Sequence, residues 1–161
     1  MNNLGVTKAF DQSAYDRADT KAKKAMIGWL KEQDHCRIKS DETYSFDLIS
    51  EVDEGLPRHL YEVEMKSQWW GGEWPPSWKE IRIPYRKSRL INRWKSECPD
   101  DLLTFVVFRG DCLKAWFIDG DTVMDSEVRE VSNRRIKNGE KFFHINVGDA
   151  YLVDMKHEGN S

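Results

Sequence analysis

Apolar residues recur along the chain with two different periods, which predict helices and strands in alternation. Across residues 13–33 small and apolar side chains recur every three to four positions, which predicts an amphipathic helix. These positions are Ala18, Ala22, Ala25 or Met26, and Trp29 or Leu30. Residues 44–52 and 60–68 instead alternate between apolar and polar side chains, and a turn-rich segment containing Gly55 and Pro57 separates them. This pattern predicts a β-hairpin.

The second half of the chain repeats the order of helix and strands. Residues 85–96 place Leu90, Ile91 and Trp94 on one helical face, and the apolar runs 102–109 and 112–118 flank a short turn, which predicts a second hairpin. Residues 141–154 provide one or two further strands. A helix, two strands, a helix and two strands together predict an α/β fold, a sandwich in which a central mixed sheet is flanked by helices.

Composition narrows the class of protein. The chain has 161 residues, which suits one domain, and 39% of them are hydrophobic. No run approaches the roughly 18 apolar residues of a spanning helix, and the first residues lack the apolar run of a signal peptide, so a cytoplasmic protein without a membrane partner is expected. The three cysteines predict neither a disulfide framework nor a zinc site. No glycine-rich phosphate loop appears, so no nucleotide cofactor is expected.

Basic residues are concentrated in one segment of an otherwise acidic chain. The formal net charge is −3, yet residues 79–95 contain seven basic residues and one acidic residue. Arginines recur there on one side of the predicted second helix, where they either contact nucleic-acid phosphates or form a solvated helix face. The candidate DNA-binding arginines are Arg82, Arg86, Arg89 and Arg93.

The polar face of the first hairpin carries the chemistry. On residues 60–68 the two-residue period places Glu62, Glu64, Lys66 and Gln68 on one face, and Asp47 lies on the preceding strand. Carboxylates on neighbouring strands can share one Mg²⁺, and a lysine two residues from Glu64 would sit beside the bound water. An exposed ladder of ionic side chains is the alternative reading of the same residues.

This D-x16-E-x-K pattern resembles the PD-(D/E)XK nuclease superfamily. Phe46-Asp47-Leu48-Ile49 is similar to the first motif of archaeal Holliday junction resolvases, with Phe46 in place of proline, and Glu64-Met65-Lys66 matches the second. The resemblance implies a restriction endonuclease-like three-layer sandwich, a single domain over 1–161 with its core at about 13–118 and C-terminal strands to about 154. It further implies metal-dependent hydrolysis of DNA, with Mg²⁺, or Mn²⁺ in its place, on Asp47 and Glu64 and with Lys66 assisting the water.

Many members of this superfamily also place a glutamate on the first helix, and this chain has none there before Glu32. Asp16 or Asp19 is the substitute that the sequence offers. The absence of that glutamate keeps a second interpretation open, a catalytically inactive nuclease-fold module that binds nucleic acid or another protein. The size of the chain is typical of a phage or bacterial accessory nuclease.

The remaining candidates surround this motif. Glu62 either provides a second carboxylate for metal or pairs with a lysine, and Gln68 either hydrogen-bonds a phosphate or ends the strand as an ordinary polar residue. Four of the seven tryptophans lie within residues 69–78. Trp69 and Trp70 follow the motif directly, where their rings either stack on unpaired bases or pack beneath the second helix. A homodimer would favour cutting junctions or both strands, and a monomer nicking or end processing.

Overall fold

The computed structural model describes residues 12–40, 46–53, 55–66, 68–132 and 139–155, apart from the side chains of residues 12–19, 36 and 40. Six strands form a mixed sheet in the order β1-β2-β3-β5-β6-β9. Only the β3–β5 pair is parallel within this sheet; its other neighbours are antiparallel. The strands are β1 (Cys36–Ser40), β2 (Leu48–Glu51), β3 (His59–Met65), β5 (Leu102–Phe108), β6 (Lys114–Asp119) and β9 (Tyr151–Asp154).

A second, three-stranded antiparallel sheet lies beside the first. Its order is β4-β8-β7, formed by β4 (Glu80–Pro84), β8 (Glu140–Asn146) and β7 (Glu127–Val131). The helical elements are α1 (Gln12–Glu32), η1 (Tyr85–Lys87), α2 (Ser88–Glu97), α3 (Gly120–Asp125) and η2 (Val147–Asp149). The chain therefore passes from β3 through β4, η1 and α2 before it returns to the sheet as β5, parallel to β3.

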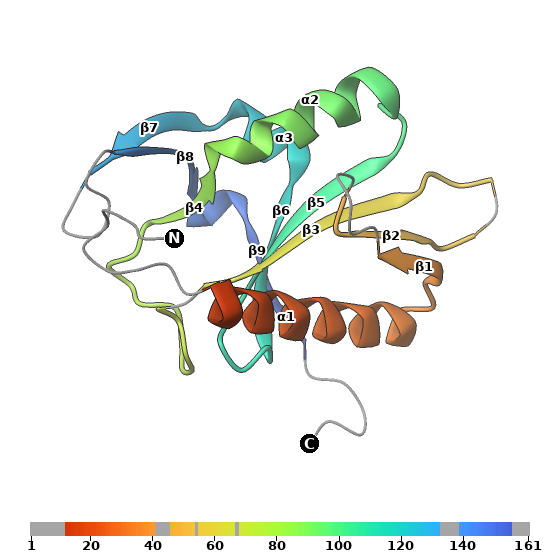
Figure 1. Cartoon of the computed structure of the whole chain (residues 1–161), viewed down its shortest axis with the longest axis horizontal. Helices are drawn as coiled ribbons and strands as arrows, with labels where there is room; N and C mark the ends of the chain where they lie inside the picture. The colour runs from red at the N-terminus through yellow and green to blue at the C-terminus, as the bar shows by residue number, and fades with distance from the viewer. Residues whose placement is uncertain (1–11, 41–45, 54, 67, 133–138, 156–161) are drawn as a thin grey trace.

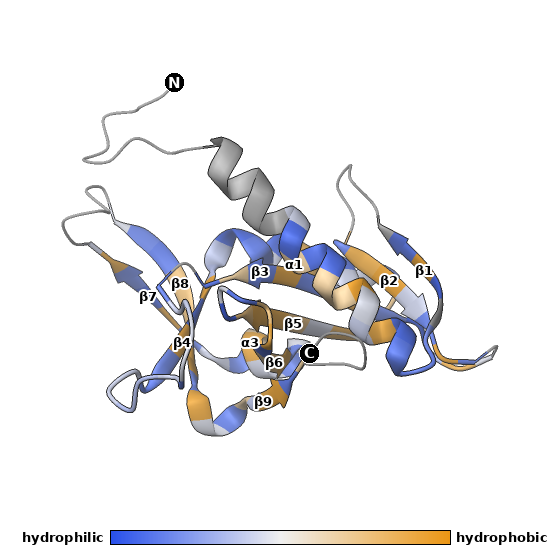
Figure 2. Ribbon diagram, turned by 90° about the horizontal axis from the view of Figure 1, so that it is seen from below, coloured by the Kyte–Doolittle hydropathy of each residue, from blue (hydrophilic) through white to orange (hydrophobic). Residues whose placement is uncertain are grey.

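Helices cover both faces of the large sheet (Figure 1). On one face, α1 presents Ala22, Met26 and Leu30, at four-residue spacing and fully buried, to the side chains of Tyr61 and Val63 on β3. On the other face, apolar residues of α2 and of the second sheet pack together against the opposite side of β3, β5 and β6. Figure 2 shows the same division, with apolar residues along β2, β3 and β5 behind α1 and a mostly polar β7 at the margin.

These features confirm the α/β class and the mixed sheet between helices, and they correct several predicted elements. The first helix, both hairpins and the second helix form where the periodicity indicates, within a few residues. Four elements were not predicted: β1, β4, α3 and β7. They are short, so an apolar period has little room to develop in them: β7 is solvent-exposed for most of its length, and the alternation in β4 spans only five residues.

The predicted strands 44–52 and 60–68 are also shorter than expected. In the described part of the first, β2 begins at Leu48, so Asp47 precedes the strand instead of lying in its middle. In the second, β3 ends at Met65 because the Lys66 carbonyl accepts the Trp69 N–H in a turn. Across the residues that the structure describes, no helix is long and apolar enough to cross a membrane.

Candidate active site at the end of the β2–β3 hairpin

Asp47 is held at the point where β2 begins beside β3. The first residue of β2, Leu48, pairs with Tyr61. Just beyond this pair, the Val63 N–H donates to Asp47 Oδ2 at 3.0 Å, so the side chain continues the contact between the strands. The second carboxylate oxygen, Oδ1, lies 3.9 Å from Lys23 Nζ of α1. One oxygen of Asp47 is thus hydrogen-bonded to the backbone of β3, while the other lies near the longest distance at which it still forms an ion pair with Lys23.

Glu62 is buried and paired with a lysine that sequence reasoning did not single out. Its side chain is 3% exposed, and its Oε1 accepts from Lys87 Nζ at 2.6 Å. Its Oε2 accepts the Asp47 N–H at 2.7 Å. Burial opposes the charge on Lys87, but nearby carboxylates, led by Glu62, outweigh it and raise the pKa of Lys87. Of the two roles open to Glu62, the structure therefore shows the lysine pair.

Glu64 lies two residues further along the same face of β3, among cations. Burial raises the pKa of its carboxyl above the usual range, although neighbouring positive charges act in the opposite direction. These charges belong, in order of strength, to Lys87, Arg86 and Lys66. A carboxyl that is desolvated in this way gains more from a directly bound cation than an exposed one would. The hairpin thus brings Asp47, Glu62 and Glu64 to one end of β3.

Lys66 follows β3 and faces a cavity. Burial lowers the pKa of its ammonium group, and the positive charge of Arg82 lowers it further, against the opposite effect of Glu64. Its Nζ lies 5.5 Å from the centroid of the Trp78 ring. A lysine with a lowered pKa near a carboxylate is a recognised feature of sites where a water molecule is positioned or deprotonated. Gln68, which is exposed, lines the same cavity.

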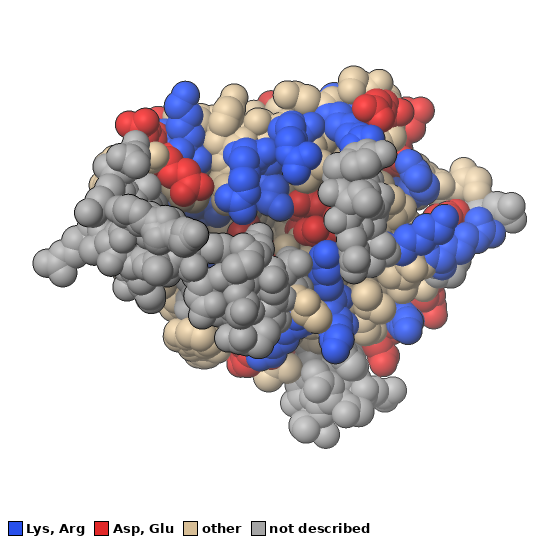
Figure 3. Space-filling view, in the orientation of Figure 1, with Lys and Arg blue, Asp and Glu red and all other residues tan. Residues whose placement is uncertain are grey.

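The predicted DNA-binding residues divide between this site and the rest of the molecule. Arg82 lines the cavity with Lys66, and Arg86 is exposed near Glu64, although it also lies 3.8 Å from Glu140. Arg89 is exposed on α2, and Arg93 pairs with Glu97 one turn later. Figure 3 shows basic side chains gathered over the first turns of α2 and more of them over α1, with acidic atoms exposed between the two groups.

The two candidate tryptophans have opposite environments. Trp70 is 72% exposed, so its ring is free to contact a partner. Trp69 is 2% exposed and packs edge to face against Trp74 in the core, so the prediction that it stacks on a base is wrong. Trp69 follows the predicted strand 60–68, and β3 itself ends at Met65, so the two-residue period of the strand gives no orientation for the Trp69 ring. Asp19, the substitute for a helix glutamate, has a side chain outside the described part of the structure.

The donor set fits a hard divalent cation held by few protein ligands. Asp47 and Glu64 offer carboxylate oxygens, and Mg²⁺ prefers one or two carboxylates with water and phosphate oxygens completing its octahedron. No group of three histidine, cysteine, aspartate or glutamate side chains suited to a metal occurs among the described residues. Since Glu62 is already paired with Lys87, the described residues of this site offer a metal two carboxylate ligands, Asp47 and Glu64.

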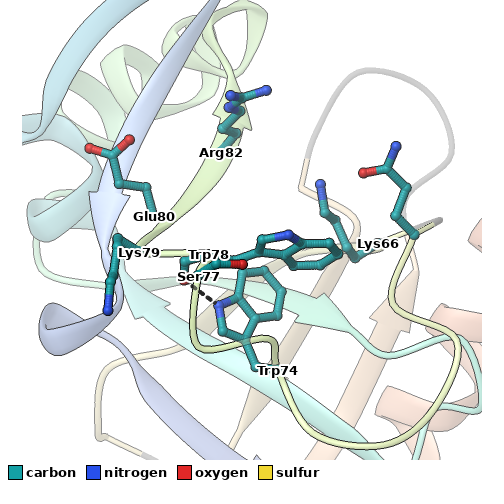
Figure 4. Close-up of a pocket in the computed structure, with 8 residues that line it drawn as sticks. Lys66, Trp74, Ser77, Trp78, Lys79, Glu80 and Arg82 are labelled. Carbon is teal, nitrogen blue, oxygen red and sulfur yellow. Dashed lines mark hydrogen bonds between the residues drawn. The ribbon is translucent and has the colours of Figure 1, made fainter.

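Two functional neighbours were not anticipated from the sequence. The sequence groups Lys87 with the basic residues of the segment 79–95 that would contact phosphates, and its contact with Glu62 depends on the path of the chain over β3. Trp78 was grouped with the other tryptophans of the loop, and its position beside Lys66 depends on the same path (Figure 4). No protein-family model matches the chain, and no curated protein sequence shows significant similarity to it.

Proposed function

We propose that this protein is a metal-dependent DNA endonuclease with a restriction endonuclease-like fold of the PD-(D/E)XK type. One observation carries the proposal: Asp47 is anchored to the backbone of β3 at Val63, one residue before Glu64 and three before Lys66. The surrounding order supports it, since a helix precedes the hairpin with these residues, a second helix follows, and the next strand of the large sheet is parallel to β3.

In the proposed reaction, water adds across a phosphodiester bond: its oxygen bonds to phosphorus as the bond to the leaving oxygen breaks, and one of its protons ends on the leaving oxygen. Asp47 and Glu64 would hold Mg²⁺ or Mn²⁺, which supplies Lewis-acid stabilisation of charge on the phosphate. Lys66 orients the attacking water and takes part in moving its proton, a role that suits its lowered pKa. Arg82 and Arg86 hold the flanking phosphates by forked hydrogen bonds, which position the strand without reading its sequence.

A second candidate function rests on the small number of carboxylates. Because Glu62 is paired with Lys87, the described part of this site leaves two carboxylates, Asp47 and Glu64, for a metal. A domain of the same fold that binds nucleic acid without cutting it needs no metal ligands, so it is compatible with this small set. The two functions differ in one measurable property. The endonuclease binds a divalent cation and cleaves, whereas the binding module associates with DNA and leaves it intact.

The test is calorimetric titration of Mg²⁺ and of Mn²⁺ into the wild type and the Asp47→Asn variant, followed by cleavage assays. The asparagine keeps an oxygen for the Val63 N–H, so the hairpin contact survives while the charge is lost. Duplex, single-stranded and four-way-junction DNA are the substrates. Asp121→Asn, which changes an exposed carboxylate paired with Lys95, is the matched control.

The endonuclease proposal expects metal binding in the wild type and in Asp121→Asn, its loss in Asp47→Asn, and cleavage of at least one DNA. It also expects Lys66→Ala to bind metal yet cleave at least about 100-fold more slowly, as loss of a proton-transfer group does. Binding of DNA with neither metal uptake nor cleavage would instead establish the binding module. Size-exclusion chromatography with light scattering then shows whether the active species is a monomer or a homodimer.

A further inference from the structure

A cavity of about 320 Å³ opens beside Lys66, outside the group of carboxylates. It lies between the end of β3, the tryptophan-rich loop and β4, and its lining includes Lys66, Gln68, Trp74, Trp78, Glu80 and Arg82. In Figure 4 the Trp78 ring lies between Lys66 on one side and the strand that carries Glu80 and Arg82 on the other. The cavity therefore combines cationic side chains with an aromatic surface.

The charges in this cavity favour an anion. In the part of the chain that the structure describes, neither Lys66 nor Arg82 forms an ion pair with an acidic side chain. Glu80, the one carboxylate among the described lining residues, is already engaged by Arg129 and by His144 Nδ1, the latter at 3.2 Å. Besides burial, the positive charge of Arg82 lowers the pKa of Lys66 against the opposite effect of Glu64, so the two cations repel each other, and a phosphate placed between them would relieve that repulsion.

The aromatic surface is fixed in position. Trp74 Nε1 donates to the Trp78 carbonyl at 2.7 Å, and the two rings meet edge to face with centroids 5.0 Å apart. Trp74 is in turn packed edge to face against Trp69 and Trp116. A ring held in this way loses little conformational entropy when a flat ligand stacks on it. Phosphate and a flat ring joined within one small ligand describe a nucleotide.

We propose that this cavity receives one unpaired nucleotide of a DNA strand, with its base against Trp78 and its phosphate on Arg82 and Lys66. The assignment of the ligand to DNA rests on the proposed function. A paired base in an intact duplex stays stacked on its neighbours and does not enter such a cavity without being extruded. The substrate class that follows is DNA with an unpaired nucleotide at the cleavage position, such as a bulge, a flap or a single strand.

Binding is measured by fluorescence anisotropy without divalent cation, so that no cleavage occurs. The probes are a labelled duplex with one unpaired 2-aminopurine, the same duplex fully paired, and free dAMP as a competitor. We expect the wild type to bind the unpaired probe about tenfold more tightly than the paired one, which is the range of one base stacked on an aromatic ring. Arg82→Ala and Trp78→Leu each reduce this preference at least about threefold, whereas Lys95→Ala, which removes a cation on α2 paired with Asp121, leaves it unchanged.

Circular dichroism first shows that each variant is folded. Arg82 is exposed, so Arg82→Ala carries the test if loss of the Trp78 indole unfolds the loop. Equal affinity of the wild type for both duplexes, or a preference that neither variant changes, overturns the inference. Displacement of the unpaired probe by dAMP at the concentration at which the oligonucleotide itself competes also overturns it, because the cavity would then belong to a free nucleotide.

Cleavage in Mg²⁺ separates this inference from the proposed function. If the paired duplex is cleaved at the same rate as the bulged one, the proposal of an endonuclease stands and the proposal that the cavity selects an unpaired nucleotide is contradicted. If binding prefers the unpaired probe in a way that depends on Arg82, but no DNA is cleaved, the cavity is supported as a nucleotide site and the proposal of an endonuclease is contradicted.

Discussion

Glu62 shows how one buried carboxylate is accommodated at the edge of the site. Two hydrogen bonds satisfy its oxygens, one from the Lys87 ammonium and one from the Asp47 N–H. Burial raises the pKa of Glu62, and Lys87 acts against that rise. The ammonium thereby ties η1 to β3, and it keeps a negative charge next to Asp47 that would otherwise be expensive to bury.

Lys87→Met is expected to lower the free energy of unfolding by about 3 kcal/mol at pH 8, because it leaves a buried carboxylate without its cation. Since the folded-state pKa of Glu62 would rise further above its unfolded value, the loss is smallest at acid pH, where the carboxyl is protonated, and grows as pH rises through the folded-state pKa. Urea unfolding at several pH values measures this.

The exposed pair Lys95–Asp121 provides the control for that variant. Its side chains are 41% and 62% exposed, so Lys95→Met is expected to change stability by less than about 1 kcal/mol at any pH. A loss for Lys87→Met that is equally small, or that increases toward acid pH, would contradict the role given to Glu62.

Two histidines near the end of α1 make stability depend on pH in the opposite direction. The His35 and His59 rings meet at 4.9 Å, and His35 Nδ1 lies 2.7 Å from the buried Ser50 Oγ. Burial lowers the pKa of both histidines, and the charge of His59 lowers that of His35 further. The unfolded chain therefore binds more protons than the folded one just below the ordinary histidine pKa of about 6.5.

From this difference we expect the free energy of unfolding to fall as pH drops below about 6.5, down to the lowered folded-state values. His59→Phe keeps a ring beside Tyr61 but removes one titrating group, so its stability should decline less steeply over the same interval. Denaturant unfolding of both proteins in matched buffers gives the two slopes. Identical slopes would show that His59 does not titrate on unfolding.

At the scale of elements, the tryptophan-rich loop is ordered by the β5–β6 turn rather than by regular structure. Arg109 Nη1 donates to the Gly72 carbonyl at 2.6 Å, and the Gly110 N–H donates to the Trp69 carbonyl at 2.6 Å. Trp70 packs closely against Gly110, because a Cβ built at Gly110 would lie 2.8 Å from Trp70 Cε3 and 3.1 Å from Trp70 Cα. The exposed Trp70 ring thus has a firm support.

Gly110→Ala should push Trp70 and its backbone away from the turn, with a loss of about 1–3 kcal/mol, the range for overpacking a tight contact. Gly71→Ala is the matched control: its nearest atom, Asp111 Oδ2, lies 4.0 Å from the new Cβ, so stability should change by no more than about 0.5 kcal/mol. Thermal unfolding followed by tryptophan fluorescence reports both. Equal stability of the two variants would refute the support role.

The elements that the sequence predicted are those with a long apolar period. Residues of α1 and both hairpins repeat their apolar positions over several turns or pleats, and they form where expected. In β4, Ile81 and Ile83 alternate with Glu80 and Arg82, which is the pattern of a strand. This pattern covers only five residues and runs directly into the basic segment of the predicted second helix, so it does not define a strand of its own. The motif located Asp47, Glu64 and Lys66 by spacing, whereas Lys87 and Trp78 come into place only through the crossover between β3 and β5.

At the scale of the whole molecule, an acidic chain gathers basic side chains in one region of its surface. The formal net charge is −3, but exposed arginines gather near the first turns of α2, next to Glu64 and Lys66. Such a distribution favours phosphate contacts at one face and disfavours DNA over the remainder. The proposed DNA complex should therefore show a moderate dependence on salt, set by a few contacts.

Arg86→Ala and Arg89→Ala should each weaken DNA binding to a similar degree for all sequences and reduce the slope of log K against log salt by about 1. Lys95→Ala, at the far end of α2 and paired with Asp121, should leave the slope unchanged. Anisotropy titrations at several salt concentrations provide these slopes. If all three variants have the same slope as the wild type, Arg86 and Arg89 do not contact DNA phosphates.

The seam between the two sheets has a consequence for how such a site can diverge. Arg82 belongs to β4, which pairs with β8 of the small sheet, whereas Lys66 follows β3 of the large one. The two strands belong to different sheets, so their separation depends on packing in the apolar core that both sheets share, which includes Ile83 and Phe143 of the small sheet and Leu60 and Phe105 of the large one. Exchanges among these hidden side chains could widen or narrow the gap between the two cations. Substrate choice could thus drift in descendants of this protein while every residue that touches DNA stays the same.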